Sequence, residues 1–252
     1  MGDSDTTDLE RTVSSLLFFA FGFDLSDLRN AESDSTIIDC LIKKAYVDAT
    51  NQGAFNAQAK KQEDEKRSNA KIKGEVILKK QISNLKEDTD FDEWHKSLCR
   101  ALVEAYEEDF AERFTYGNAQ KWINMTLKYA DMLCPLYSHL PIEMPLWMDA
   151  IAKHHANLHL PVDSYIIEAV WKCCDGLKRS EPQKNELLPL AIEELERGGW
   201  GKYSPDKVKS WSKWNEGDYL KFREQLRLIL EETPIEWEAE AWINIAKQRK
   251  RD

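Results

Sequence analysis

Residues 115–133, TYGNAQKWINMTLKYADML, and residues 158–170, LHLPVDSYIIEAV, decide the predicted fold of this chain. In the first stretch, a turn with one glycine leads into a helical pattern that places Lys121 in its first turn. In the second stretch, an extended apolar segment precedes one carboxylate, Asp163, which stands at the start of another predicted helix. One lysine and one aspartate, each at a helix N-terminus, are therefore the first candidates for chemistry.

The rest of the chain predicts helices almost throughout. Apolar residues recur three and four positions apart and β-branched alternation is scarce, which favours an all-α protein of about ten helices. Capping residues, among them Asn118 and Asp163, and the prolines set the expected boundaries. We expect one all-α domain over residues 1–252, either as a single body or as two lobes with a cleft. The expected helices span residues 6–20, 34–50, 55–85, 90–112, 118–133, 145–156, 163–175, 184–197, 205–212, 215–232 and 234–248.

The composition is that of a folded protein without a membrane span. Hydrophobic residues make up 42% of the 252 residues, and the net charge of −10 argues against a non-specific nucleic-acid coat protein. No apolar run approaches the roughly 18–20 residues that cross a membrane, and the N-terminal flank is acidic, so we expect a cytoplasmic protein. Basic residues gather in 54–86, 202–227 and 247–251. These runs are either solvated helix faces or a DNA-binding surface.

Common nucleotide, hydrolase and metal motifs are absent from the sequence. The five cysteines lack C-x-x-C spacing, so a disulfide framework, a zinc knuckle or an iron–sulfur cluster is not expected. The sequence also lacks the P-loop, the dinucleotide fingerprint and the serine-hydrolase elbow. His155 and His159 lie four residues apart, which leaves a shared metal as a minor alternative. We therefore expect neither a cofactor nor a metal.

The turn at Gly117 separates two predicted helices, 90–112 and 118–133. Helices joined in this way form a hairpin, whose amides and positive helix end can receive a DNA phosphate. An ordinary helix connection that uses the glycine as a C-cap has the same pattern. The positive end of the second helix favours the neutral amine of Lys121, the form that acts as a nucleophile. Lys128 follows seven residues later on the same face.

These elements resemble the helix-hairpin-helix and aspartate motif of the DNA glycosylase superfamily (HhH-GPD). They are most similar to the archaeal 8-oxoguanine glycosylases, whose hairpin helix begins with Gln-Lys and carries a second lysine seven residues on. Gln120, Lys121 and Lys128 match that pattern here, and residues 162–166, VDSYI, match the V-D-x-x-V element of the family. The resemblance covers roughly residues 110–172, and the chain is also similar in size and helical content to an antiphage glycosylase.

The resemblance implies an enzyme that cleaves the N-glycosidic bond of a modified base flipped out of double-stranded DNA, leaving an abasic site. Asp163 would stabilise positive charge on the sugar, and Lys121 could attack C1′ and add strand nicking as a second activity. The hairpin would span about 90–133 and the aspartate loop and helix about 157–175, in a monomer. The residues expected to contact DNA are Tyr116, Gly117, Asn118, Gln120 and Lys128, and those expected to line the base pocket are Trp122, His159, Trp171, Trp200 and Trp211.

A different class of function also fits the sequence. Most aromatic residues at helical spacing belong to the core, and an aspartate at a helix start has a sufficient role as a cap. The alternative is a non-catalytic helical module that binds DNA or a protein in a defence or regulatory system. An enzyme predicts that Lys121 and Asp163 meet across an open cleft with basic walls. A binding module predicts that they lie apart, with the aromatic residues exposed as a patch.

Overall fold

The computed structural model describes residues 3–30, 34–50, 61–110, 114–140, 143–179, 210–230 and 232–250. Within these ranges the regular elements are all helical, in agreement with the predicted class, and ten of them are α-helices. None of these helices combines the length and the apolar character that crossing a membrane requires. The predicted helix 184–197, residues 205–209 of another and Trp200 lie outside the described residues.

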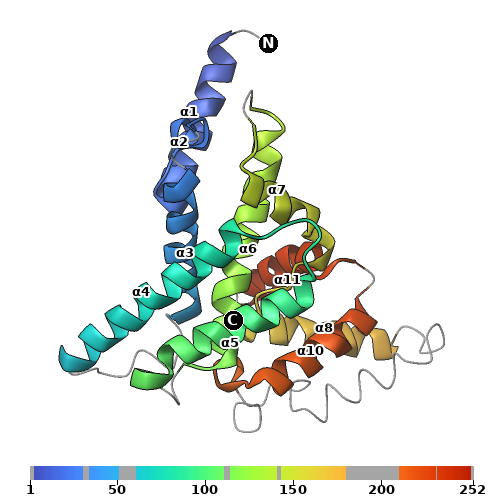
Figure 1. The fold of residues 1–252 in the computed structure, drawn as a ribbon. Helices are drawn as coiled ribbons and strands as arrows, with labels where there is room; N and C mark the ends of the chain where they lie inside the picture. The colour runs from blue at the N-terminus through green and yellow to red at the C-terminus, as the bar shows by residue number, and fades with distance from the viewer. Residues whose placement is uncertain are drawn as a thin grey trace.

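Figure 1 shows the helices in chain order. Among the described residues, two 3-10 helices, η2 and η3, accompany the α-helices. In order, the elements are α1 (Asp3–Phe21), α2 (Leu25–Leu28), α3 (Asp34–Thr50), α4 (Lys61–Ser83), α5 (Phe91–Phe110), α6 (Tyr116–Tyr137), α7 (Leu146–Lys153), η2 (His155–Asn157), α8 (Ser164–Arg179), η3 (Trp211–Lys213), α10 (Glu216–Ile229) and α11 (Pro234–Arg249).

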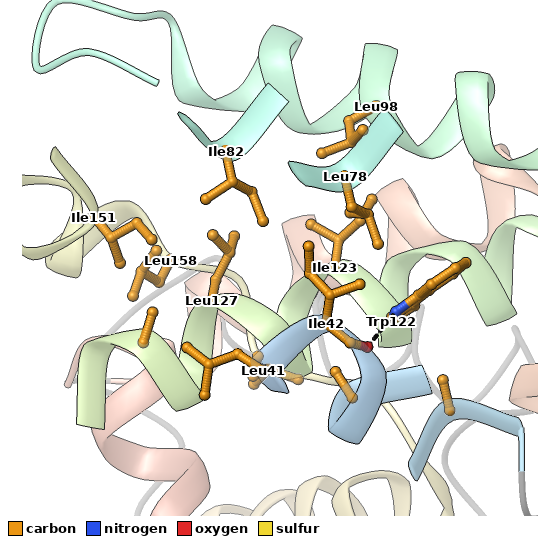
Figure 2. Close-up of a cluster of buried hydrophobic side chains, with 14 of the residues drawn as sticks. Leu41, Ile42, Leu78, Ile82, Leu98, Trp122, Ile123, Leu127, Ile151 and Leu158 are labelled. Atoms are coloured by element: carbon orange, nitrogen blue, oxygen red, sulfur yellow. Dashed lines mark hydrogen bonds between the residues drawn. The ribbon is translucent and has the colours of Figure 1, made fainter. Parts of the chain in front are cut away.

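Helix α6 forms the centre of the body, with α3, α5, α7 and α10 packed around it. Figure 1 shows α6 running through the middle of the molecule, with α1, α2 and α3 along one side. The side chains of Trp122, Ile123 and Leu127 on α6 are almost completely buried. Figure 2 shows them meeting apolar side chains of α3, α4 and α5. Each such side chain stabilises the fold by roughly 1.5–3 kcal/mol, so α6 is held rigidly enough to carry a site.

The start of α6 differs from the prediction for a local chemical reason. Thr115 is the N-cap: its hydroxyl accepts a hydrogen bond from Asn118 N, and the Asn118 side chain accepts one from Thr115 N. Asn118 is therefore the third residue of a capping box rather than the cap itself. Gly117 lies inside the first helical turn, so it is not the turn residue or C-cap that the sequence suggested. The helix also continues past the predicted end at residue 133 and through Pro135 to Tyr137.

Most of the other boundaries fall within a few residues of the predicted ones. Asp163 caps α8 as predicted, because its Oδ1 accepts hydrogen bonds from the amides of Tyr165 and Ile166. The predicted helix 145–156 is divided into α7 and η2, and only η3 represents the predicted helix 205–212 among the described residues. Short helix α2 was not predicted; Asp24 caps it through a capping box of its own.

Candidate functional site

The structure brings Lys121 and Asp163 together, although 42 residues separate them in the chain. Lys121 Nζ donates a hydrogen bond to Asp163 Oδ2 at 2.7 Å, and the two side chains are only 7% and 10% exposed. The other carboxylate oxygen, Oδ1, accepts the amides of Tyr165 and Ile166 at 2.8 and 3.0 Å. One oxygen of Asp163 therefore caps α8, and the other holds the ammonium group.

Two side-chain amides of α6 fix the extended segment that precedes Asp163. Gln120 Nε2 donates to Val162 O at 3.1 Å, and Gln120 Oε1 accepts from Val162 N at 3.3 Å. Asn124 Nδ2 donates to Leu160 O at 3.0 Å and also to Gln120 Oε1 at 3.0 Å. Both amides are fully buried, where an unmade hydrogen bond is costly. Gln120, which the sequence placed on DNA, therefore positions the aspartate segment.

Lys121 and Asp163 line a pocket of about 430 Å³ between α3, α6, α8 and α11. Its charged lining is balanced, with three lysines and three carboxylates, so its walls are not basic as the sequence had led us to expect. The rim reaches the surface, where the side chains of Met132 and Trp242 are 58% and 39% exposed. The lining residues are Lys44, Asp48, Lys121, Met125, Lys128, Tyr129, Met132, Asp163, Tyr165, Glu238 and Trp242.

Glu238 is a pocket residue that the sequence did not reveal. It lies on α11, its side chain is 1% exposed, and one carboxylate oxygen accepts a hydrogen bond from Lys128 Nζ. Burial raises the pKa of the Glu238 carboxyl, and the charge of Lys128 opposes that rise. In the sequence it is one of several acids near a helix start. Only its burial against Lys128, a residue expected to contact DNA, distinguishes Glu238 from the other acidic residues near the start of α11.

A second polar cluster lies in the same pocket, on α3 and α6. Lys44 Nζ donates to Asp48 Oδ2 at 2.6 Å, and the hydroxyl of Tyr129 donates to the same oxygen. Burial raises the pKa of Tyr129, and the hydrogen bond to Asp48 raises it further. The hydroxyl therefore remains a donor at neutral pH. The rings of Phe21 and Tyr129 form an edge-to-face pair with their centroids 5.2 Å apart.

A pair of stacked aromatic residues from α8 and α11 also lines the pocket. The rings of Tyr165 and Trp242 stack with centroids 5.0 Å apart and an interplanar angle of 25°. The guanidinium of Arg249 lies 4.1 Å from the Tyr165 centroid, and Arg249 also forms an ion pair with Glu168. These contacts hold Tyr165 in place at the pocket wall. Trp242 was not among the aromatic residues that the sequence analysis had selected.

The start of α6 is covered by residues 210–215. Gly117 N donates to Trp214 O at 3.0 Å, and a Cβ on Gly117 would lie 1.9 Å from Trp211 O. The hydroxyl of Thr115 donates to Ser212 O at 2.8 Å. The chain's own carbonyls therefore occupy this end of the helix, where a phosphate was expected. Four residues expected to contact DNA are buried in this arrangement: Tyr116, Gly117, Asn118 and Gln120.

The aromatic residues expected to line the base pocket lie elsewhere. Trp122 is part of the core, and its Nε1 donates to Ile42 O at 2.9 Å, the dashed line in Figure 2. Trp171 is half-buried on α8. Trp211 is 5% exposed and its ring faces Lys121, with Nζ 5.0 Å from the ring centroid. None of these three residues lines the 430 Å³ pocket.

His159, the remaining candidate for the base pocket, belongs to a buried polar network. Its Nε2 lies 2.9 Å from Asp92 Oδ1, and its Nδ1 lies 3.0 Å from the hydroxyl of Tyr219. Burial lowers the pKa of His159 to about 4, although Asp92 opposes that change. The ring is therefore neutral at pH 7 and has a structural role between α5 and α10.

The structure separates the histidines that had suggested a metal site. His155 faces Asp131 at 2.9 Å and Glu236 at 3.4 Å, whereas His159 lies in the irregular stretch after η2 and faces Asp92. Among the residues that the structure describes, no group of three histidine, cysteine or acidic side chains is placed to hold a metal ion.

The pocket thus combines the buried Lys121–Asp163 pair, two further lysine–carboxylate pairs and an aromatic wall. This set can hold a flat polar molecule and stabilise positive charge next to Asp163. No family model, no curated protein and no solved structure matches this chain.

Proposed function

We propose that this chain is a DNA glycosylase of the helix-hairpin-helix superfamily, which cleaves the N-glycosidic bond of a modified base. The observation that carries the proposal is the 2.7 Å contact between Lys121 Nζ and Asp163 Oδ2 at the wall of a pocket. Helices α5 and α6 would be the two helices of the hairpin, and residues 157–175 would be the aspartate loop and its helix. The proposed product is an abasic site in double-stranded DNA.

Asp163 suits the role of the transition-state carboxylate. Cleavage of the bond from C1′ to the base builds positive charge on the sugar, and a fixed anion nearby stabilises it. The two amide bonds to Oδ1 hold the carboxylate in one orientation, so little reorganisation is needed as the charge develops. Because the group is largely buried, its field is screened less than it would be in water.

Lys121 has two roles consistent with its position. In its charged form it pairs with Asp163 Oδ2. In its neutral form the amine can attack C1′ and displace the base, giving a Schiff base that leads to strand nicking. The second role needs the amine within reach of the sugar, and its contact with Asp163, the residue proposed to face that sugar, is consistent with this.

The rest of the pocket supplies features that suit an extruded base. The stacked rings of Tyr165 and Trp242 offer a flat apolar wall against which a heteroaromatic ring can stack. The Lys128–Glu238 pair offers a hydrogen-bond donor beside an acceptor, which suits the edge of a base. Since the pocket's own charges balance, attraction to the DNA backbone would come from basic residues outside it, such as the end of α11.

Excision of defined modified bases tests the proposal. Duplex oligonucleotides, each with one modified base, are incubated with the protein and treated with alkali, which cleaves at abasic sites. We expect cleavage at one class of modified base, and a loss of roughly 100-fold or more in rate for Asp163→Asn. The matched control is Asp131→Asn, on the same helix as Lys121 but outside the pocket. An Asp163→Asn protein that excises the base at the unaltered rate would remove the mechanism.

The exposed apolar residues of α1 favour a second candidate function, a module that binds a partner protein. Leu9, Leu16, Phe18 and Phe19 are each more than half exposed, and Phe19 is 87% exposed. A cluster of this kind is common at protein interaction sites. The variant Leu16→Ser/Phe19→Ser separates the two candidates, because it alters α1 and leaves the pocket intact. Unaltered excision by this variant favours the enzyme, whereas failure of the wild type to excise any tested base favours the module.

A further inference from the structure

The ammonium group of Lys121, which donates a hydrogen bond to Asp163 Oδ2, also lies over the ring of Trp211. The ring centroid is 5.0 Å from Lys121 Nζ, within the distance of about 6 Å at which a cation is attracted to an aromatic face. Tryptophan gives the strongest attraction of this kind among the aromatic side chains. Both Trp211 and Lys121 are buried, at 5% and 6% exposure, so water screens this attraction little.

The backbone around Trp211 is held firmly against the start of α6. Gly117 N donates to Trp214 O, and Thr115 Oγ1 donates to Ser212 O. The carbonyl of Trp211 approaches Gly117 so closely that any Cβ there would overlap it, at 1.9 Å. The glycine is therefore needed for a close approach of two segments, since its backbone has no positive φ angle. This contact fixes where the Trp211 ring lies relative to Lys121.

We propose that Trp211 is a positioning residue that holds the Lys121 amine beside Asp163, where the sugar of an extruded nucleotide would react. This inference rests on the proposed glycosylase function. Asp163 has only one oxygen for both the ammonium and the developing charge on the sugar, because its other oxygen caps α8. Because that one oxygen faces both charges, the ring of Trp211 supplies a second contact that keeps the ammonium in place. The amine reacts from that position once it has lost its proton.

The reaction that reports this role is the trapping of an abasic site. The lone pair of the Lys121 amine adds to the C1′ aldehyde of the opened sugar. The carbonyl oxygen leaves as water after two proton transfers, and a C=N bond forms. Borohydride then delivers hydride to that carbon and leaves a stable C–N bond between protein and DNA. The probe is a duplex with a single abasic site, so the identity of the excised base does not enter the assay.

The first experiment compares trapping rates with affinity for the same abasic duplex. For Trp211→Leu we expect trapping to slow by roughly 2- to 30-fold, with the dissociation constant for the duplex unaltered. Trp211→Phe restores part of the rate because it keeps an aromatic face. The matched control is Trp147→Leu, since Trp147 is equally buried on α7 but does not line the pocket. Lys121→Met gives no adduct.

A second experiment measures the position of the amine without DNA. Acetic anhydride acetylates lysines, the amine displacing acetate, and mass spectrometry gives the rate at Lys121 relative to Lys128 in the same molecule. Removing the ring that covers Lys121 raises its relative rate several-fold in Trp211→Leu, whereas Trp147→Leu leaves the ratio unchanged. Circular dichroism establishes that each variant is folded before either measurement.

The two experiments separate the failure of the inference from that of the proposed function. If the wild type traps DNA through Lys121 and Trp211→Leu traps equally fast, the positioning role is wrong and the glycosylase proposal stands. If the wild type gives no adduct, the nucleophilic role of Lys121 fails, and the acetylation ratio decides whether Trp211 holds the amine. An unaltered ratio in Trp211→Leu would overturn the inference in either case.

Discussion

Replacing the charges of Lys121 and Asp163 separately and together is expected to show that they stabilise the fold only as a pair. Breaking a buried ion pair by removing one partner costs about 3–5 kcal/mol, because the other charge is left buried alone. The two side chains are 7% and 10% exposed at a pocket wall, which places the expected cost near the low end of that range. Asp163→Asn is the cleaner single change, since asparagine caps helices about as well as aspartate.

The magnitudes follow from what each variant leaves behind. Asp163→Asn leaves an unpaired ammonium, and we expect a loss of about 3 kcal/mol in the free energy of unfolding. Lys121→Met leaves a carboxylate that still accepts two amides, so its loss should be smaller, about 2 kcal/mol. The double variant leaves no unpaired charge, and its total loss should be no larger than that of Asp163→Asn alone.

Urea unfolding of the four proteins measures these losses, with the slope against urea checked for constancy. The coupling free energy from this double-mutant cycle should be about 2 kcal/mol. Losses that add to within about 0.5 kcal/mol would refute the reasoning, because they would show two independent groups. Such a result would mean that the ammonium and the carboxylate are each solvated through the pocket.

Three further changes test other parts of the structure. Gly117→Ala forces a Cβ against Trp211 O, so we expect slower borohydride trapping and a loss of about 1–3 kcal/mol in the free energy of unfolding measured with urea. The control is Gly176→Ala, whose Cβ meets nothing within 4 Å and should cause neither effect. Glu238→Gln removes a buried carboxylate whose pKa is raised. If Glu238 acts as an anion in excision, the excision rate of the wild type rises with pH through that pKa, and the rate of Glu238→Gln does not. The pKa of His159 is lowered to about 4 from 6.5, so below pH 6.5 the unfolded chain takes up the proton first. The contribution of His159 to the free energy of unfolding should therefore be fully present above pH 6.5. It should fall toward pH 4 by at most about 1.4 kcal/mol per pH unit. In His159→Asn the free energy of unfolding should fall less steeply over the same range.

Local sequence patterns predicted the helices well because each carries its own signals. Asp163 precedes a helical run and caps it, as expected from an aspartate in that position. The start of α6 was misplaced because Thr115 and Asn118 are both good capping residues three positions apart, and a capping box uses both. Only the packing of residues 210–215 over Gly117 shows why a glycine stands inside the helix.

The sequence singled out pocket residues only where each lies at the start of a predicted helix. Lys121 and Asp163 lie at such positions, whereas Glu238 and Trp242 enter the pocket from α11, near the other end of the chain. Their place depends on how α11 packs against α8 and on the ion pair that joins Glu238 to Lys128 of α6, which no local pattern encodes. Likewise, a tryptophan at helical spacing fits a core or a pocket equally well, and Trp122 lies in the core.

The double contact of Asp163 restricts which residues can occupy that position. Serine, threonine and asparagine reach the amides at the start of α8, but none of them carries the charge that the neighbouring ammonium needs. Glutamate carries the charge, but its extra methylene moves the carboxylate away from those amides. In a library that samples every side chain at position 163, selection for a stable protein and selection for excision should therefore recover the same amino acid.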